Sequence, residues 1–465
     1  MRNIFVLLTY LLLTNCMLTG CMIGPDYVRP EIETPEQWTI EYQTAVDLAN
    51  TRWWQQFGDP MLDSMIEASV RGNLDLKLAT ARVEQYLGVL DTTRSQMFPQ
   101  ITGGFAPSAQ RAAGVTSENY PATLNGTWEI DVWGKIRRST EAAQAQILAS
   151  EAGRRTVLMT VVSNVASAYL TLRGLDRQLE IAQVTETIYA DSLKLFQLRF
   201  KYGSISQLEL FQAESQYESA RQAIPAYESL IKQQENLLAL LLGRAPAAIP
   251  RGKPLDLLTP IGIPEGLPST LLERRPDIIQ AEQSLVAANA NIGAAKAAYF
   301  PNLSLTGAFG VASSDLDSLF SSGTTIWSNG GQLVAPLLNF GKISGQVKQA
   351  EAIQQQALHQ YHMTVLTGFK EVEDALVKNI KGKEQFEALK RQVKALEEYV
   401  RISRLQFEAG TTNYLQVLDA ERSLFTGRLS LAQTKYDLLV AGVSVYKAMG
   451  GGWIAEADSL LKMVD

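Results

Sequence analysis

The chain carries the same pattern twice, and this duplication constrains its fold more than any other feature. A Phe-Pro pair recurs after 202 residues, and a Gly-Lys-Ile triplet recurs after 207. A third set of residues also recurs after 207: Phe200, Gly203, Leu208, Ala213 and Glu214 return as Phe407, Gly410, Leu415, Ala420 and Glu421. Repetition at a fixed period indicates a repeated structural unit. We therefore expect two similar copies of a unit of about two hundred residues.

Each copy has room for a very long helix, because long stretches of the chain lack proline. No proline lies between Pro121 and Pro225 or after Pro336, and proline inside a helix costs about 3 kcal/mol. Apolar residues recur at three- and four-residue steps from Lys135 to about Tyr202, and the second copy repeats this from about Lys342 to Glu408. At about 1.5 Å per residue, such a helix is roughly 100 Å long.

Each predicted long helix ends in a glycine turn, at Gly203 in the first copy and Gly410 in the second. Glycine adopts the left-handed conformation that commonly closes a helix C-terminus. Ser206 and Asn413 follow at positions where they can cap a returning helix. Each copy is therefore predicted to form an antiparallel helical hairpin with coiled-coil packing.

A pair of strands is predicted before each long helix. From Leu124 to Trp133 apolar and polar residues alternate, as they do around Leu303 and Phe309, whereas Ile326 to Leu338 is less regular. One apolar and one polar face fit either a half-buried sheet in water or a membrane barrel with a wet interior. Four strands are too few to close a barrel, for which about eight is the practical minimum. A barrel would therefore have to be shared between chains.

The N-terminus is predicted to be a lipoprotein leader. Arg2 precedes an apolar stretch that has the length of a signal-peptide core and is too short to span a bilayer. Leu18-Thr19-Gly20-Cys21 resembles the lipobox of bacterial lipoproteins, which implies cleavage before Cys21 and acylation of that residue. Cys16 is a competing site, disfavoured by Asn15 before it, and a free Cys21 thiol beside an uncleaved leader is the remaining alternative. A chain cleaved at Cys21 has no second cysteine for an internal disulfide.

Proline-rich segments separate the expected parts of the chain. We expect a leader (1–20), a lipid-anchored irregular segment (21–60), a first repeat (61–242, with its strand pair at about 98–133), a proline-rich linker (243–276), a second repeat (277–449, with its strand pair at about 300–339) and a tail (450–465).

Composition and motifs argue against an enzyme or a nucleic-acid-binding protein. The net charge of −6 and the absence of a basic run give no footprint for nucleic acid. No glycine-rich phosphate loop follows a strand, and no constellation for a nucleophile is present. His359 and His362 are three residues apart, a spacing that permits a metal face, but without a nearby cysteine we interpret them as solvated helix residues. We therefore expect no catalytic residues, no metal site and no cofactor.

Several longer strings resemble the OprM/CusC (NodT-type) lipoprotein branch of the TolC-like outer-membrane efflux proteins, across essentially the whole mature chain. They are Gly24-Pro25-Asp26-Tyr27 with Arg29-Pro30, Arg274-Arg275-Pro276-Asp277, the run from Ala287 to Ala295, Leu418-Asp419-Ala420-Glu421-Arg422-Ser423-Leu424-Phe425, and Gly450-Gly451-Gly452-Trp453.

This resemblance implies an α+β fold in which long helical hairpins of three chains form a periplasmic α-barrel. Four strands per chain would contribute to a twelve-stranded outer-membrane β-barrel. The implied protein is a homotrimeric exit duct, anchored in outer-membrane lipid, with a large periplasmic portion. Its implied partners are a periplasmic adaptor (membrane fusion) protein and an inner-membrane transporter of the resistance-nodulation-division class. Met22 after Cys21, in place of aspartate, fits outer-membrane sorting.

Leu415, Asp419 and Arg422 are the candidate gate residues. They lie at i, i+4 and i+7, on one face of the predicted helix, and by resemblance they match the family's periplasmic aperture. In a trimer, three such faces would form a hydrophobic ring and a carboxylate ring at the mouth. The alternative is a local surface ion pair of little energetic value. The first copy carries Leu208, Gln212 and Ser215 at the matching positions, so we expect the second hairpin to move when the mouth opens.

Gly203, Ser204, Gly410 and Thr411 at the two turns are the candidate contacts for the adaptor, in addition to their role as helix ends. For the whole chain we expect passive efflux of drugs or other toxic small molecules. A duct for metal ions or for a secreted protein is the alternative within the same class. A structural coiled-coil lipoprotein without a pore is the alternative from another class, and the alternating strands around Trp128 argue against it.

Overall fold

A computed structural model of the chain describes residues 22–30, 52–262 and 275–451. The predicted leader, Cys21 and most of the tail lie outside the described residues. The chain divides into two compact units. The first includes Thr80–Gly153 and Asp277–Thr364, and the second includes Arg154–Pro276 and the part of the chain after Thr364. Each unit draws on both copies of the repeat.

The helices repeat with the spacing found in the sequence. Two helices have 67 residues each, α4 (Lys135–Lys201) and α7 (Lys342–Glu408), and two have 35 residues each, α5 (Gln207–Leu241) and α8 (Tyr414–Ala448). All four bounds of the first hairpin recur 207 residues later, which confirms the predicted pair of helical hairpins. The one proline inside this set, Pro225, lies within α5 and does not end it.

Three shorter helices precede the strands. They are α2 (Pro60–Gly72), α3 (Leu74–Ser95) and α6 (Pro276–Ala297). The α3 and α6 helices each have 22 residues and begin 202 residues apart, the same spacing as the Phe-Pro pair that follows each of them. The described part of the chain contains no helix that is both long and apolar enough to cross a membrane.

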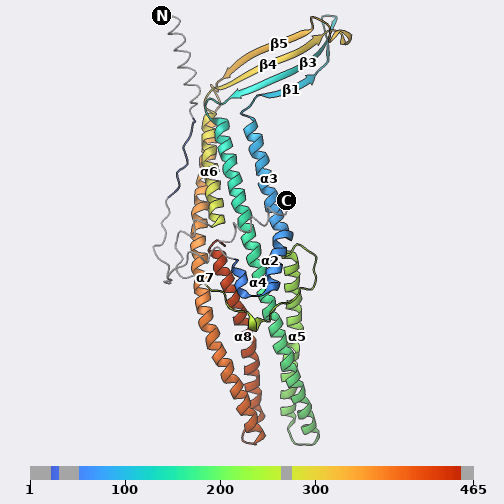
Figure 1. The fold of residues 1–465 in the computed structure, drawn as a ribbon, viewed down its shortest axis with the longest axis vertical. Coiled ribbons are helices and arrows are strands. Elements are labelled where there is room, and N and C mark those ends of the chain that lie inside the picture. Colours follow the sequence, from blue (N-terminus) through green and yellow to red (C-terminus); the bar gives the residue numbers. More distant parts are fainter. Residues whose placement is uncertain (1–21, 31–51, 263–274, 452–465) are drawn as a thin grey trace. The chain divides into compact units, whose positions relative to one another are not determined.

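The strands form one antiparallel sheet, drawn side by side in Figure 1 in the order β1-β3-β4-β5, with β2 also on β3. Their bounds are β1 (Gln100–Phe105), β2 (Ser108–Ala112), β3 (Val115–Ile130), β4 (Asn302–Ser313) and β5 (Thr325–Val334). The β1 and β2 segments follow β3 in one continuous register, so they are a single strand interrupted at Pro107, which has no N–H to donate. The sheet therefore has the four predicted strand positions.

Two of the predicted strand ends were wrong. The β3 strand ends at Ile130, where a tight turn begins with the Val132 amide donating to the Ile130 carbonyl at 2.9 Å. Val132 is therefore outside the strand, although it continues the alternation. The β5 strand ends at Val334, so Pro336 also lies beyond it.

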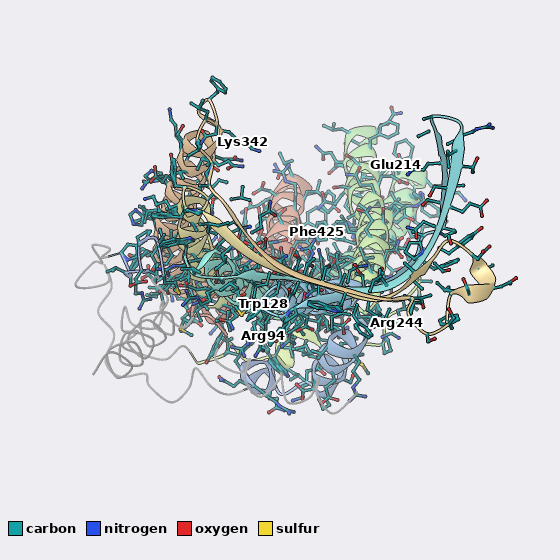
Figure 2. The ribbon with its side chains drawn as sticks, turned by 90° about the horizontal axis from the view of Figure 1, so that it is seen from above. Arg94, Trp128, Glu214, Arg244, Lys342 and Phe425 are labelled. Carbon is teal, nitrogen blue, oxygen red and sulfur yellow. The ribbon has the colours of Figure 1, made fainter. Side chains whose placement is uncertain are left out.

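The register places apolar side chains of neighbouring strands on one face of the sheet. Leu124 lies opposite Phe309, and Phe309 lies opposite Trp327. All three are exposed in the isolated chain. Trp128, labelled in Figure 2, belongs to the same face and donates its indole N–H to the Met97 carbonyl at 3.0 Å. The sheet thus presents an apolar face that the described residues leave largely uncovered.

The two copies connect their strands differently. In the first copy, β2 and β3 meet at Ala113 and Gly114, both with positive φ, as in the two-residue turns that match strand twist. In the second copy, residues 314–324 join β4 to β5. This longer connection includes the 3-10 turn η5 (Leu316–Ser318) and is braced by the Thr324 hydroxyl donating to the Leu319 carbonyl at 2.8 Å.

The segment after α5 packs on the helices of its own unit. Asp59 is fully buried and accepts hydrogen bonds from the Tyr169 hydroxyl at 2.6 Å and from the Lys253 amide at 3.0 Å. Arg251 in the same segment forms an ion pair with Glu235 of α5. These contacts hold the proline-rich linker against α4 and α5.

Candidate functional site at the hairpin tips

Both hairpin tips have the same backbone. Gly203 and Gly410 each have φ of +72°, a conformation that favours glycine. After each glycine the next amide reaches back to the helix, from Ser204 to the Arg199 carbonyl at 2.8 Å and from Thr411 to the Gln406 carbonyl at 2.9 Å. This is the Schellman arrangement of a helix C-terminus. The glycine caps predicted from the sequence are confirmed.

The returning helices begin with the predicted caps. The Ser206 hydroxyl accepts from the Glu209 amide, and the Glu209 carboxylate accepts from the Ser206 amide at 2.7 Å, which makes a capping box. Asn413 caps α8 by accepting from the Gln416 amide at 3.3 Å. The N-terminus of α5 therefore has one more capping bond than the N-terminus of α8.

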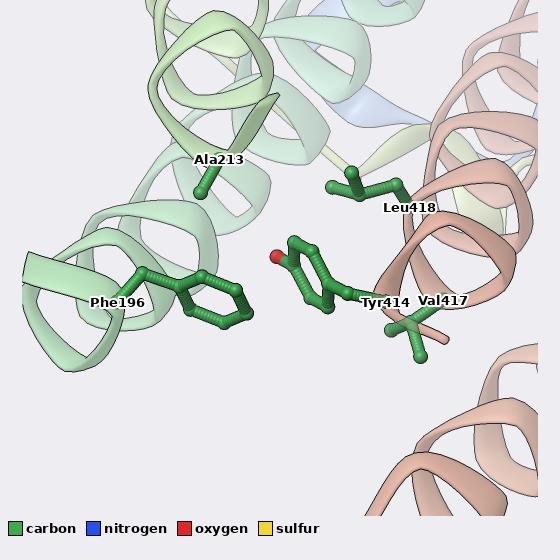
Figure 3. Packing of buried hydrophobic residues seen from close by; sticks show 5 residues of the cluster. All are labelled: Phe196, Ala213, Tyr414, Val417 and Leu418. Atoms are coloured by element: carbon green, nitrogen blue, oxygen red, sulfur yellow. The ribbon is translucent and has the colours of Figure 1, made fainter. Parts of the chain in front are cut away.

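A hydrophobic cluster packs the two hairpins against each other near their tips (Figure 3). The first hairpin contributes Phe196 of α4 and Ala213 of α5. The second hairpin contributes three residues of α8, namely Tyr414, Val417 and Leu418. The rings of Phe196 and Tyr414 lie 4.0 Å apart between centroids. Large buried aromatic side chains dominate the energetics of such contacts. This cluster is therefore the principal apolar contact between the two tips.

A polar layer lies beside this cluster, and the predicted site residues do not include it. Glu421 of α8 is only 6% exposed, and its Oε1 accepts from Nε of Arg404 of α7 at 2.8 Å. Its other oxygen, Oε2, is buried without a hydrogen-bond partner. Buried polar atoms without partners are costly. The layer is therefore only partly satisfied in this conformation.

The electrostatics of the layer follow from its burial. Burial, with a further contribution from the Glu421 carboxylate, raises the pKa of Tyr189 well above its ordinary value. Burial raises the pKa of Tyr414 in the same way, again with Glu421 contributing. Both phenols are therefore held neutral at physiological pH, next to the Glu421–Arg404 ion pair.

The sequence carried a signal for this layer. The Ala-Glu pair is repeated as Ala213-Glu214 and Ala420-Glu421, but Glu214 is exposed and Glu421 is buried. An arginine one helix away, at position 404, has glutamine as its counterpart at 197. The difference between Gln197 and Arg404 is therefore the signal for this pair in the sequence.

The structure places Leu415, Asp419 and Arg422 on the exposed side of α8, as their spacing predicted. Arg422 donates to Asp419 Oδ1 at 3.1 Å, and both side chains are at least half exposed. The counterparts Leu208 and Ser215 are also exposed, and Gln212 is half-buried. In the isolated chain, therefore, only the second of these two faces carries charge.

The two histidines are on α7, where His359 is exposed and His362 is half-buried. Within the described ranges, no group of three or more His, Cys, Asp or Glu residues is arranged to hold a metal ion. Cys21, the predicted acylation site, lies outside the described residues.

Comparison with known proteins shows which family has this sequence and fold. A family model described as outer membrane efflux protein matches residues 65–244 and 267–451. The solvent efflux pump outer membrane protein SrpC of Pseudomonas putida is 35% identical over 406 residues, which cover 85% of this chain and 86% of SrpC. The cation efflux system protein CusC of Escherichia coli is 35% identical over 409 residues, which cover 87% of this chain and 89% of CusC.

A solved structure agrees with these matches. The open state of the Neisseria gonorrhoeae MtrE outer membrane channel matches with a TM-score of 0.85 and 29% identity, covering 93% of this chain and 99% of that chain. The family match includes both repeats, with their strands and helical hairpins. The chain therefore belongs to the outer membrane efflux protein family.

Proposed function

We propose that this protein is the outer-membrane exit duct of a tripartite efflux pump, through which drugs or other toxic small molecules pass from the periplasm to the exterior. The observation that carries the proposal is a sheet with an exposed apolar face in a chain that also forms two long helical hairpins. A soluble protein covers such a face, whereas lipid covers it in a membrane-spanning sheet.

The duct is assembled from three chains. The sheet has two open edges, β1 with β2 on one side and β5 on the other. Unpaired backbone groups are not tolerated in the hydrocarbon region, so a membrane sheet must close. Three chains with four strand positions each supply the twelve strands of the expected barrel. The helical hairpins of the same three chains line the periplasmic tunnel, and Cys21 carries the lipid anchor.

The mouth of the duct is gated by the second hairpin. Three copies of Leu415 form an apolar constriction, and three copies of Asp419 form a ring of negative charge that Arg422 of the same helix partly neutralises. Solvated ion pairs of this kind are weak, at about 0.2–1 kcal/mol. A modest binding free energy from the adaptor and the transporter is therefore enough to rearrange these ion pairs.

Single-channel conductance in a planar bilayer tests the gate. Asp419→Ala and Arg422→Ala are each expected to raise the conductance of the resting channel, because each removes one member of the pair at the mouth. The matched controls are Gln212→Ala and Ser215→Ala at the corresponding positions of the first hairpin, which should leave conductance unchanged. Equal conductance in all four variants and the parent would refute the gate.

The adaptor engages the tips, and the inner-membrane transporter of the resistance-nodulation-division class supplies the energy. Ser204 and Thr411 are exposed and follow the tip glycines, so bulky residues there change the tip surface without forcing a side chain into positive φ. Ser204→Trp and Thr411→Trp are expected to lower crosslinking to the adaptor while the trimer persists. Loss of the trimer would mean that these positions serve only the fold.

A passive duct does not select its cargo strongly, so drugs, solvents and metal ions remain compatible with one channel. The relatives illustrate this range, since one is named for solvent efflux and another for cation efflux. Identification of the inner-membrane partner in the crosslinked assembly would assign the cargo. A drug transporter is the expected result, and a metal transporter would establish the alternative.

A further inference from the structure

A groove of about 570 Å³ lies between α4, α7 and α8 in the second compact unit. The short 3-10 turn η3 (Leu255–Leu257) also lines this groove, through Asp256. None of the described residues that line it belongs to the candidate gate or to the two tip turns. Binding sites for small molecules typically have volumes of about 300–1,000 Å³. The groove is therefore large enough to bind a small molecule.

Much of the lining of this groove is apolar. Ile181 of α4, Val393 of α7 and Ala432 of α8 are buried lining residues. Phe386 and Leu431, which also line the groove, are half-buried. Both helical hairpins therefore contribute to one apolar surface. Because the transfer of apolar surface out of water is favourable, this lining favours a ligand with an apolar part.

The acidic side chains that line the groove are all paired with arginines. Arg177 of α4 forms ion pairs with Glu180 at 2.7 Å and with Asp256 of η3 at 3.2 Å. Arg428 of α8 forms an ion pair with Glu397 of α7 at 2.7 Å. These five residues include every carboxylate among the described lining residues. The negative charge of the lining is therefore already balanced by the two arginines.

Two lysines of the lining add positive charge that no carboxylate balances. Lys435 of α8 is half-buried, and its ammonium donates to the backbone carbonyl of Asp256 at 2.8 Å, whereas Lys390 of α7 is exposed. Within the described ranges, neither lysine forms an ion pair. Burial lowers the pKa of Lys435, the Asp256 carboxylate opposes this change, and the cations of Lys390 and Arg177 add to it. An anion bound beside Lys435 would relieve this repulsion.

We propose that this groove binds a small amphipathic anion, an apolar chain or ring that carries one carboxylate, sulfonate or phosphate group. The apolar part covers Ile181, Val393 and Leu431, and the ammonium groups of Lys390 and Lys435 bind the anionic end. An inorganic anion would leave the apolar lining in water, and a neutral amphiphile would leave both lysines without a carboxylate. The inference does not depend on the proposed duct, because the groove lies within one chain and outside the candidate gate.

Titration with octanoate tests the proposal, with acetate and octanol as matched controls. Acetate has the carboxylate without the chain, and octanol has the chain without the charge. The full-length protein is placed in lipid nanodiscs, so that no detergent competes, and its lysines carry ¹³C-methyl groups, which keep the positive charge. The Lys435 signal is assigned by its loss in Lys435→Gln. Octanoate should shift this signal and raise the pKa of Lys435, because a carboxylate beside an ammonium group favours its charged form.

Variants of the lining test which residues bind octanoate. Lys390→Gln should raise the octanoate concentration that half-shifts the Lys435 signal by about tenfold, since it removes one charged partner of the carboxylate. Val184→Asp places a negative charge at a half-exposed lining position and should also weaken binding. The matched control is Lys383→Gln, which removes an exposed lysine of α7 outside the groove and should leave binding unchanged. The native mass of each variant shows that it is folded and assembled like the parent.

A response of Lys435 to octanoate alone, weakened by Lys390→Gln and not by Lys383→Gln, supports the proposal. Acetate that acts at the same concentration as octanoate would overturn it in favour of a simple anion site. Octanol that competes as strongly as octanoate would show that only the apolar surface binds. A Lys435 signal that none of the three compounds shifts would also overturn the proposal, as would equal effects of the two lysine variants. Channel conductance is measured separately, so each of these failures leaves the proposed duct intact.

Discussion

The two hairpin tips have nearly the same backbone and very different side chains. Their helices have equal lengths, and their glycines have the same φ of +72°. Yet the second tip buries Tyr414 and Glu421 and pairs Glu421 with the partly exposed Arg404, whereas the counterparts of these three residues are Gln207, Glu214 and Gln197. The duplication therefore supplies the geometry, and substitutions at a few positions give the second tip its own interactions.

The largest difference between the tips is expected from Tyr414→Ala. This change removes a buried aromatic ring from the cluster with Phe196 and should cost about 3 kcal/mol of local stability. The measurement is hydrogen exchange in detergent, in which the amides of the first turns of α8 should exchange faster because this region opens more readily. The counterpart change Gln207→Ala, at an exposed site, should cost no more than about 0.5 kcal/mol. Equal effects at both tips would contradict the comparison.

The Glu421→Ala change should have the next largest effect. It leaves Arg404 without its carboxylate, and breaking a buried pair costs about 3–5 kcal/mol. Because Arg404 is partly exposed, we expect about 2 kcal/mol in the same exchange measurement. The matched control Glu214→Ala changes the repeated Ala-Glu pair at its exposed copy and should be nearly silent. A silent Glu421→Ala would show that the layer does not hold the tips together.

High pH should weaken the packing of Tyr189 of α4 and Tyr414 of α8 around Glu421. The pKa of Tyr189 and of Tyr414 is raised in the folded protein above the ordinary value of 10.0, so the unfolded chain releases these protons first. Their stabilisation is fully present below pH 10 and decreases above it, by about 1.4 kcal/mol per pH unit for each tyrosine. The measurement is tyrosinate absorbance as a function of pH, in which Tyr189→Phe and Tyr414→Phe each remove one phenol and so assign its titration. A parent in which both phenols titrate near pH 10 would contradict the shift.

The caps should give the smallest difference. Loss of either cap by Ser206→Ala or Asn413→Ala should cost about 1 kcal/mol at the start of its helix. The Ser206 change should cost slightly more, because the Ser206 hydroxyl also donates to the Glu209 carboxylate at 2.9 Å. Exchange of the first-turn amides of α5 and α8 measures both. A larger loss at Asn413 would reverse the expected order.

The long helices could be predicted from the sequence because proline spacing and apolar periodicity act locally. Gly203 and Gly410 could be predicted for the same reason, since a helix that must end and reverse favours glycine at its C-terminus. The strand ends were harder. Val132 continues the alternation of β3, yet the turn that leads into α4 removes it from the sheet. Alternation alone does not report where hydrogen bonding stops.

The polar layer could not be found by periodicity, because Glu421 looks like any helical glutamate until its partners are known. Its burial depends on packing against other helices, on which Arg404 lies 17 residues away in sequence and Tyr189 lies in the first copy of the repeat. The exposed gate residues needed only their spacing on one helix to be placed on a common face. The burial of Glu421 depends on packing between helices, whereas the common face of the gate residues depends only on the geometry of one helix.

The unequal connections between the strands have a practical consequence. The two-residue turn at Ala113 and Gly114 has no room for added sequence without disturbing β2 and β3. Residues 314–324, in contrast, are closed by their own hydrogen bonds and tolerate insertion more readily, as exposed loops generally do. An epitope or a fluorophore-binding tag placed there would label the proposed trimer three times, once in each chain. In intact cells, it would report which end of the duct faces the medium.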